Sequence, residues 1–112
     1  LIVEGEDVAL DFTFVEDIAE GFGLAATKDK AIGEVFNVTA GQAYKLLDYI
    51  EILKEYFPDL DCEVRERDGS RPKRGTLSIE KANRMIGYSP RHTLRQGLEK
   101  YISFKKENQV TL

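Results

Sequence analysis

The spacing of apolar side chains changes along the chain from every second residue to every third or fourth, and this alternation restricts the possible folds most strongly. Residues 8–15 have the two-residue repeat of a strand, with Leu10, Phe12 and Phe14 on one face. Residues 15–28 change to the repeat of an amphipathic helix. The apolar side chains of this predicted helix are Ile18, Ala19, Phe22, Ala25 and Ala26.

The alternation continues through the middle of the chain. Strands are predicted at residues 34–39 and 62–67, because these runs are too short for a helix or alternate in polarity. A long helix between them is predicted to stop before Pro58, since a proline excludes the preceding residue from helical geometry. The buried stripe of this helix would be Leu46, Leu47, Ile50, Leu53 and Phe57.

Two further helices are predicted towards the C-terminus. Ser78 is placed to cap a short helix and Gly87 to end it. Thr93 and Gln96 have the spacing of a capping box, which satisfies two free backbone amides at a helix start. The order strand, helix, strand, helix, strand, helix, helix predicts a mixed α/β fold. The apolar positions of the two helices are Ile79, Ala82, Met85 and Ile86, then Leu94, Leu98, Tyr101 and Ile102.

Length and composition argue against several classes of protein. A chain of 112 residues is long enough for one hydrophobic core but not for two. The formal charge of −4 argues against a general nucleic-acid binder, and no apolar run approaches the roughly 20 residues that cross a bilayer. Cys62 and His92 are the single residues of their types, so an internal disulfide or a zinc cluster is not expected. These features favour a cytoplasmic location.

Two patterns resemble enzyme motifs, but their positions favour structural roles. Residues 21–26 read G-x-G-x-x-A, which binds dinucleotides only in a turn between strand and helix. Here the glycines fall inside a predicted helix, where small residues allow close packing. Tyr101 and Lys105 have the Y-x-x-x-K spacing of a proton-transfer pair, but we expect a core tyrosine beside a solvated lysine. His92 is expected at the surface or in a cap, so no catalytic residue is assigned.

Five basic residues cluster between positions 65 and 74 of an acidic chain. Arg65 and Arg67 fall on the predicted edge strand, where acidic neighbours would pair with them in solvent. Arg71, Lys73 and Arg74 fall in a loop, where binding sites are common. Because arginine matches two phosphate oxygens at once, a phosphate site and a solvated surface remain equally open for these loop residues.

Three stretches together resemble the NAD-dependent epimerase/dehydratase family of extended short-chain dehydrogenase/reductases. Residues 11–19 resemble its D-F-x-x-V-x-D junction between a strand and a helix. Residues 33–38 resemble its strand with the pattern G-x-x-Y/F-N-[IVL], and residues 71–90 resemble its R-P, S-K-A and L-G-Y-x-P signature. The stretches occur in the family's order and spacing, so the resemblance covers nearly the whole chain.

The resemblance implies that residues 1–112 form one C-terminal, substrate-binding segment. It would contain the last strands and helix of a Rossmann sheet and a small helical cap over the substrate. The N-terminal Rossmann domain, which binds NAD and carries the catalytic residues, would be absent, so the segment alone would be inactive. The parent enzyme is expected to be a homodimer that binds a nucleotide diphosphate sugar, with epimerisation and dehydration both open. The alternative is a free-standing, non-catalytic α/β binding or interaction module.

The resemblance also assigns substrate-binding residues. Arg71 occupies the place of the family's arginine before proline, which contacts the nucleotide diphosphate. Gln42 is the nearest match to a polar residue that reaches the sugar nucleotide. Leu10 stands where members often have a second phosphate-binding arginine, and Lys73 and Arg74 stand where many have Gly-Asp. The extra positive charge would offset the missing arginine or indicate a different substrate.

Overall fold

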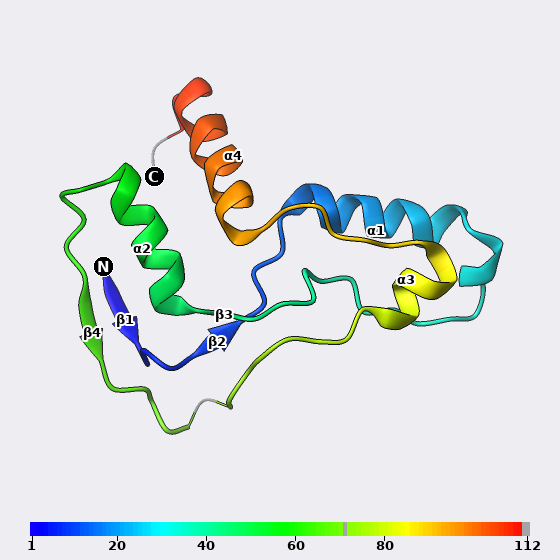
Figure 1. The fold of residues 1–112 in the computed structure, drawn as a ribbon, viewed down its shortest axis with the longest axis horizontal. Coiled ribbons are helices and arrows are strands. Elements are labelled where there is room, and N and C mark those ends of the chain that lie inside the picture. The colour runs from blue at the N-terminus through cyan, green and yellow to red at the C-terminus, as the bar shows by residue number, and fades with distance from the viewer. Residues whose placement is uncertain (71, 111–112) are drawn as a thin grey trace.

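A computed structural model describes residues 1–70 and 72–110, which form four α-helices and short strands joined by long connections (Figure 1). The alternation of strands and helices confirms the mixed α/β class. The elements are β1 (Ile2–Glu4), β2 (Ala9–Leu10), α1 (Val15–Thr27), the 3-10 helix η1 (Asp29–Ala31), β3 (Tyr44–Lys45), α2 (Leu46–Tyr56), β4 (Glu63–Arg65), α3 (Glu80–Ile86) and α4 (Leu94–Glu107).

The described strands form two separate two-stranded sheets. β1 and β4 are parallel, with Val3 opposite Val64, and Val3 is only 2% exposed. The strand expected over residues 62–67 is therefore confirmed in a shorter form, and its partner is the apolar run at the N-terminus. β2 and β3 are antiparallel, with Leu10 opposite Tyr44.

The strand expected over residues 8–15 is wrong in its length. β2 ends at Leu10 because its partner β3 has only two residues before α2 begins. Beyond Leu10, the side chain of Asp11 accepts hydrogen bonds from the amides of Ala40 and Gly41, in place of a strand backbone. Residues 11–14 therefore belong to no strand.

The strand expected over residues 34–39 does not form within the described part of the chain. A strand requires a neighbouring strand to accept and donate its backbone hydrogen bonds, and no described strand lies beside this segment. Val35 is 82% exposed. The segment contacts residues 72–79 through Asn37, whose side-chain amide donates to the carbonyl of Ser78 at 3.0 Å.

The sequence predicts three of the helix ends well, but the N-cap of α3 is Ile79 rather than Ser78. α2 stops at Tyr56, two residues before Pro58. α4 begins with the expected capping box, in which the Thr93 hydroxyl accepts from the Gln96 amide at 3.2 Å and the Gln96 side chain accepts from the Thr93 amide at 3.0 Å. α3 ends at Gly87, whose φ of 74° is the left-handed conformation that favours glycine. These ends depend on local hydrogen bonds, which explains why the sequence reveals them.

A small core joins α1 to α3. Ala82, Ile86 and Tyr88 are buried, and Leu24, Ala25, Phe36 and Val38 are among the residues packed against them. Tyr88 is fully buried, and its hydroxyl donates to the carbonyl of Thr39 at 2.9 Å. Gly21 is buried where α1 approaches this core, and a Cβ there would overlap the Val38 side chain and lie 3.2 Å from the Tyr88 ring. The close packing expected of the small residues in α1 is confirmed for Gly21 but not for Gly23, which faces open space.

Four residues expected in buried stripes are exposed. Phe22 of α1 is 67% exposed, and Ala19 and Ala26 are exposed on the same side of the helix. Tyr101 of α4 is 45% exposed, whereas Leu94, Leu98 and Ile102 are buried as expected. The helical repeat identifies which apolar side chains share a face of a helix. It does not say whether another part of the described chain packs on that face.

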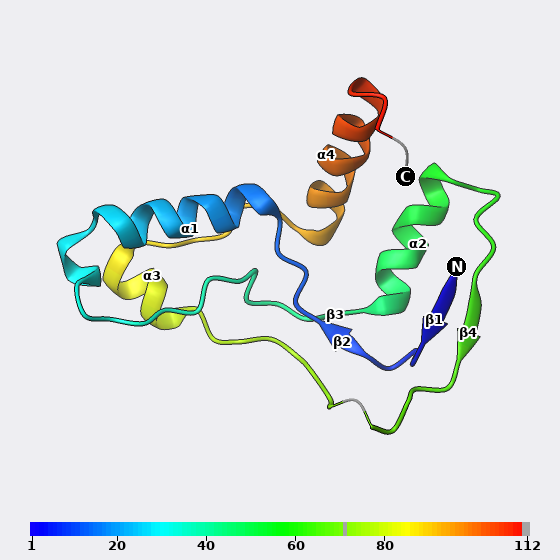
Figure 2. The ribbon, with the colours of Figure 1, turned by 180° about the vertical axis from the view of Figure 1, so that it is seen from behind.

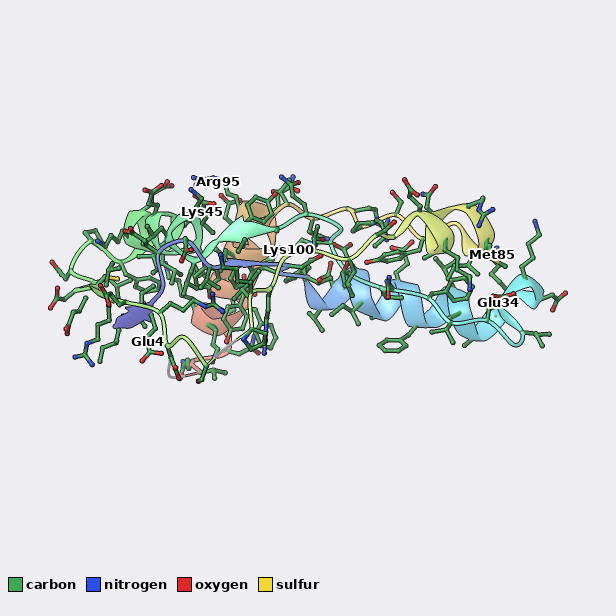
Figure 3. The ribbon with its side chains drawn as sticks, turned by 90° about the horizontal axis from the view of Figure 1, so that it is seen from below. Glu4, Glu34, Lys45, Met85, Arg95 and Lys100 are labelled. Carbon is green, nitrogen blue, oxygen red and sulfur yellow. The ribbon has the colours of Figure 1, made fainter. Side chains whose placement is uncertain are left out.

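The molecule is flat and open rather than round. α1 and α3 lie at one end, and α2, α4, β1 and β4 lie at the other, with β2, β3 and long connections between them (Figures 1 and 2). Seen from below, side chains of α1 extend both towards α3 and away from it (Figure 3). The extents are 49 × 39 × 18 Å and the radius of gyration is 16.5 Å, compared with about 13 Å for a compact chain of this length.

Candidate functional site

One carboxylate connects the segments that carry the predicted substrate-binding residues. The Asp11 Oδ1 atom accepts from the Ala40 amide at 3.0 Å and from the Thr13 hydroxyl at 3.1 Å. Its Oδ2 atom accepts from the Gly41 amide at 3.1 Å and from the Thr76 hydroxyl at 2.5 Å. Residues 40–41 and residue 76 are far apart in sequence, so Asp11 joins two loops at the end of β2. We call this arrangement the Asp11 junction.

Gln42 lies directly after the Asp11 junction. The preceding residue, Gly41, has a φ of 71°, and a Cβ at this position would lie 3.0 Å from the Ile79 side chain. Both conditions favour glycine, so the chain turns here before it enters β3. The Gln42 side chain is exposed and therefore accessible to a ligand.

Lys73 and Arg74 lie on the other loop of the junction. Together with Arg67, Asp7, Val8 and Ala9 they line a cavity of about 120 Å³ beside β2. Both side chains are exposed, and in the described part of the chain no carboxylate forms an ion pair with either of them. The structure thus brings these two predicted residues together, while the third basic residue of the loop, Arg71, lies outside the described residues.

Arg65 is separate from this cavity and behaves as the sequence predicts. Its guanidinium forms two hydrogen bonds with the Glu63 carboxylate, at 2.8 and 3.1 Å, on the exposed strand β4. Exposed pairs of this kind contribute little to stability. Arg65 is therefore a solvated surface residue and a natural control for the loop residues.

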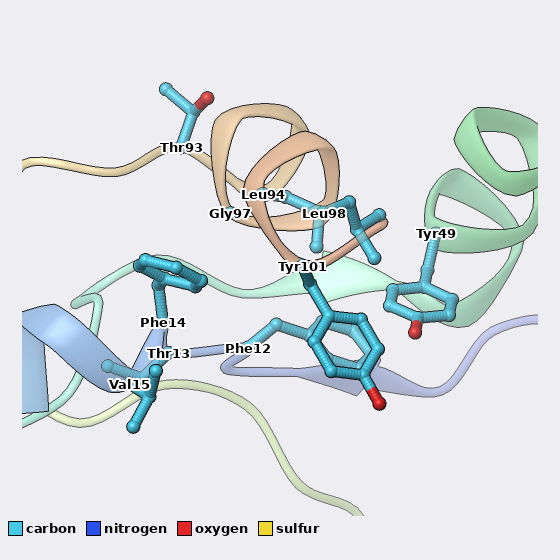
Figure 4. A pocket seen from close by; sticks show the side chains of 10 residues that line it. All are labelled: Phe12, Thr13, Phe14, Val15, Tyr49, Thr93, Leu94, Gly97, Leu98 and Tyr101. Carbon is cyan, nitrogen blue, oxygen red and sulfur yellow. The ribbon is translucent and has the colours of Figure 1, made fainter. Parts of the chain in front are cut away.

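An apolar cavity of about 470 Å³ lies between residues 12–15, α2 and α4 (Figure 4). Phe12 stacks on Tyr49, with ring centroids 5.0 Å apart and an interplanar angle of 19°. The Lys105 ammonium lies 5.5 Å from the centroid of the Tyr101 ring, so it lies by the face of the ring, as in a cation–π contact. The lining is Phe12, Thr13, Phe14, Val15, Tyr49, Thr93, Leu94, Gly97, Leu98 and Tyr101, which contains no charged group for catalysis.

A buried carboxylate that the sequence does not reveal ties α1 to the connection between α3 and α4. Asp17, in the first turn of α1, is 1% exposed. It accepts from the amides of Arg91 and His92 at 3.0 and 3.1 Å, and it lies 2.9 Å from the His92 Nδ1 atom. Burial raises the pKa of Asp17, but these hydrogen bonds outweigh burial and hold its pKa below the ordinary value.

This arrangement corrects the expectation for His92. Its side chain is only 13% exposed and its ring lies against Phe14, with centroids 4.7 Å apart. The sequence signal was the second acidic residue of the D-F-x-x-V-x-D stretch, but its partner is 75 residues away, so no local pattern could identify it. The contacts of Asp17 and His92 tie the first turn of α1 to the start of α4.

The G-x-G-x-x-A pattern of residues 21–26 does not form a dinucleotide-binding loop. The G-x-G-x-x-A pattern lies within α1, where Gly21 packs on Tyr88 instead of opening a loop in front of the helix, whereas the pyrophosphate requires free backbone amides at a helix start. Among residues 1–70 and 72–110, no cluster of His, Cys, Asp or Glu could hold a metal ion. In the same part of the chain, no helix is long and apolar enough to cross a membrane.

Comparisons with known proteins agree on one group of enzymes. The structure matches the epimerase Mth375 from Methanothermobacter thermautotrophicus with a TM-score of 0.89 and 30% identity, over 97% of this chain and 33% of that one. It matches UDP-glucuronic acid 4-epimerase from Bacillus cereus, solved with UDP-glucuronic acid and NAD, with a TM-score of 0.79 and 28% identity, over 96% and 35%. The chain is related to the NAD-dependent epimerases and dehydratases. Its fold is that of the C-terminal part of these extended short-chain dehydrogenase/reductases.

Sequence comparison leads to the same enzymes. UDP-glucuronate 4-epimerase 2 of Arabidopsis thaliana is 28% identical over an alignment 112 positions long, gaps included, which covers 85% of this chain and 25% of the plant protein. No protein-family model matches the sequence. The chain spans about a third or less of the length of the epimerases and other relatives that it matches.

Proposed function

We propose that the chain is the C-terminal, substrate-binding part of an NAD-dependent nucleotide-sugar epimerase or dehydratase and that it is inactive by itself. The observation that carries the proposal is the match of almost the whole chain to about a third of an epimerase solved with UDP-glucuronic acid and NAD. An N-terminal Rossmann domain would supply the cofactor site and the catalytic residues. The intact enzyme would be a cytoplasmic homodimer.

The open shape of the chain supports a missing covering domain. The accessible surface is 7926 Å², whereas a compact protein of this mass exposes roughly 6,200 Å². The difference is about twice the ~800 Å² that each partner buries in a standard interface. The four most exposed large apolar side chains of the described residues are Val15 and Phe22 on α1, and Ile32 and Val35 after η1. We expect the sheet of the Rossmann domain to cover this surface and to pair with residues 34–39.

The binding task is assigned to the two loops of the Asp11 junction. Lys73 and Arg74, with Arg71 in the same loop, would hold the nucleotide diphosphate, because charge-assisted hydrogen bonds to phosphate are strong. Gln42 would reach the sugar nucleotide from the other loop. Binding energy from such non-reacting groups orients the reacting carbon of the sugar, which is the contribution that this segment would make to turnover.

A titration of the intact protein with UDP, dTDP, ADP and GDP tests the binding role. We expect Arg71→Ala to weaken binding of the preferred diphosphate by about one to two orders of magnitude, since a charge-assisted bond contributes roughly 1.5–3 kcal/mol. Arg71→Lys should recover only part of the loss, because lysine lacks the planar fork. Arg65→Ala is the charge-matched control and should change little.

The salt dependence and the control decide between a binding site and a solvated surface. Binding through Arg71, Lys73 and Arg74 should weaken as ionic strength rises. Equal effects of Arg71→Ala and Arg65→Ala would show that the basic loop is only a solvated surface and would refute the assignment.

A second experiment separates the segment from the alternative of a free-standing binding module. The 112-residue chain alone should neither bind NAD nor convert UDP-glucuronic acid, while the intact protein should do both or convert a related nucleotide sugar. Turnover by the segment alone would refute the proposal. A native reading frame that starts near Leu1, without a Gly-rich loop upstream, would favour the free-standing module.

A further inference from the structure

We propose that Asp11 is a positioning residue that holds the two binding loops in one fixed arrangement. The inference rests on the proposed function for its ligand, but its geometric basis is independent of any ligand. The Asp11 junction is the point where residues 40–41 and residue 76 meet.

Both oxygen atoms of Asp11 must be acceptors. The Ala40 amide donates to Oδ1 and the Gly41 amide donates to Oδ2, each at about hydrogen-bond optimum, 3.0 and 3.1 Å. A backbone amide can donate but cannot accept. An asparagine at position 11 would therefore present its NH₂ group to one of these amides and lose that bond. The two amides also have the neutral hydroxyls of Thr13 and Thr39 as second acceptors, at 3.0 and 3.2 Å, so the carboxylate supplies the charge-assisted bond of each pair.

The junction controls the positions of the predicted ligand contacts through the backbone. Gln42 follows the bonded amide of Gly41 directly. Thr76 lies two residues after Arg74, and its hydroxyl makes, in the described part of the chain, the tertiary hydrogen bond nearest in sequence to Lys73 and Arg74. One side chain thus fixes the start of one binding loop and the end of the other.

The charge of Asp11 is compensated without use of the basic residues. Its four described partners are two amides and two hydroxyls, all neutral donors. Lys73 and Arg74 are therefore not engaged by this carboxylate, although they lie on the loop that it anchors. Because its donors are neutral, Asp11 can lie near the proposed diphosphate site without forming ion pairs with Lys73 and Arg74, which the diphosphate would need.

Amide hydrogen exchange of the intact protein without ligand tests the junction itself. We expect the Ala40 or the Gly41 amide to exchange about tenfold faster in Asp11→Asn, since the charge-assisted bond is lost and only the weaker bond to the neutral hydroxyl of Thr13 or Thr39 remains. Thr76→Val should leave both amides as slow as in the wild type, because it removes only the bond on the other loop. Asp59→Asn, at an exposed turn position, is the matched control and should change neither amide.

Titration with UDP, UDP-glucuronic acid and NAD tests the positioning role. We expect Asp11→Asn to weaken both uridine ligands by about tenfold, which is the loss of one well-placed contact, and to leave the NAD affinity unchanged. Thr76→Val should weaken UDP as well. Equal loss of NAD affinity in Asp11→Asn would indicate general unfolding and overturn the proposal.

The outcomes separate the two hypotheses. Binding of UDP by the wild type with unchanged affinity in Asp11→Asn would refute the role of Asp11 alone. Unchanged exchange of both amides in Asp11→Asn would refute it too. Faster exchange in Asp11→Asn, but no binding of any nucleoside diphosphate or nucleotide sugar by the wild type, would refute the proposed function, and with it the ligand role of the junction.

Discussion

Replacement of Asp17 by asparagine should destabilise the protein far more than any surface change of the same kind. The Arg91 amide donates to Oδ1 of Asp17 and the His92 amide donates to Oδ2, in a site that is 1% exposed. An asparagine can accept only one of them. A lost charge-assisted bond contributes about 1.5–3 kcal/mol, and a buried amide left without an acceptor costs a similar amount. We therefore expect a loss of about 2–4 kcal/mol in the free energy of unfolding.

Urea unfolding at neutral pH measures this loss. With a slope of roughly 1–3 kcal/mol per molar urea, the midpoint should fall by about 1 M or more while the slope is unchanged. Faster exchange of the Arg91 or His92 amide would locate the effect. Asp59→Asn, at an exposed position, should stay within about 0.5 kcal/mol of the wild type. If Asp17→Asn does so too, the clamp between α1 and the α3–α4 connection does not stabilise the protein.

The effect should depend on pH with a definite sign. The pKa of Asp17 is lower in the folded protein than its ordinary value, so the ionised carboxylate contributes stability above the unfolded pKa of about 3.9. That contribution is lost as the pH falls through the folded pKa. The difference in stability between wild type and Asp17→Asn should shrink as the pH falls below about 4. A difference that grows in acid would contradict the assignment of the charged state.

Four further substitutions test the packing of α1, the cap of α4 and the expected role of Tyr101. Gly21→Ala should destabilise the protein by about 1–3 kcal/mol, because its Cβ would clash with the core beside α3. Gly23→Ala, on the same helix but in open space, should stabilise it by up to about 1 kcal/mol. Thermal unfolding of both variants gives the comparison. Thr93→Ala should cost about 0.5–2 kcal/mol through loss of the bond from the Gln96 amide, measured by urea unfolding. In the intact enzyme, Tyr101→Phe should leave kcat near the wild-type value, because a phenol that relays a proton would be worth about 10²-fold or more.

The site residues show where reasoning from sequence stops. Lys73 and Arg74 could be selected because their charge stands out within one short loop. Asp11 could be matched to a known pattern, but its role depends on donors 29, 30 and 65 positions away. The same is true of Asp17 and His92. Side-chain hydrogen bonds between distant segments have no periodicity, so no repeat in the sequence predicts them.

What the sequence by itself determined is the set of α-helices, their order and most of their ends. The end of α2 before Pro58, the capping box at Thr93 and the left-handed Gly87 depend on interactions within a few residues, which the chain encodes locally. The tertiary structure decided which apolar faces are covered and which extended segments become strands. Residues 34–39 have the composition of a strand, but a ladder exists only where a second backbone supplies partners. Burial and strand pairing are properties of two surfaces together, and a single segment of sequence specifies only one of them.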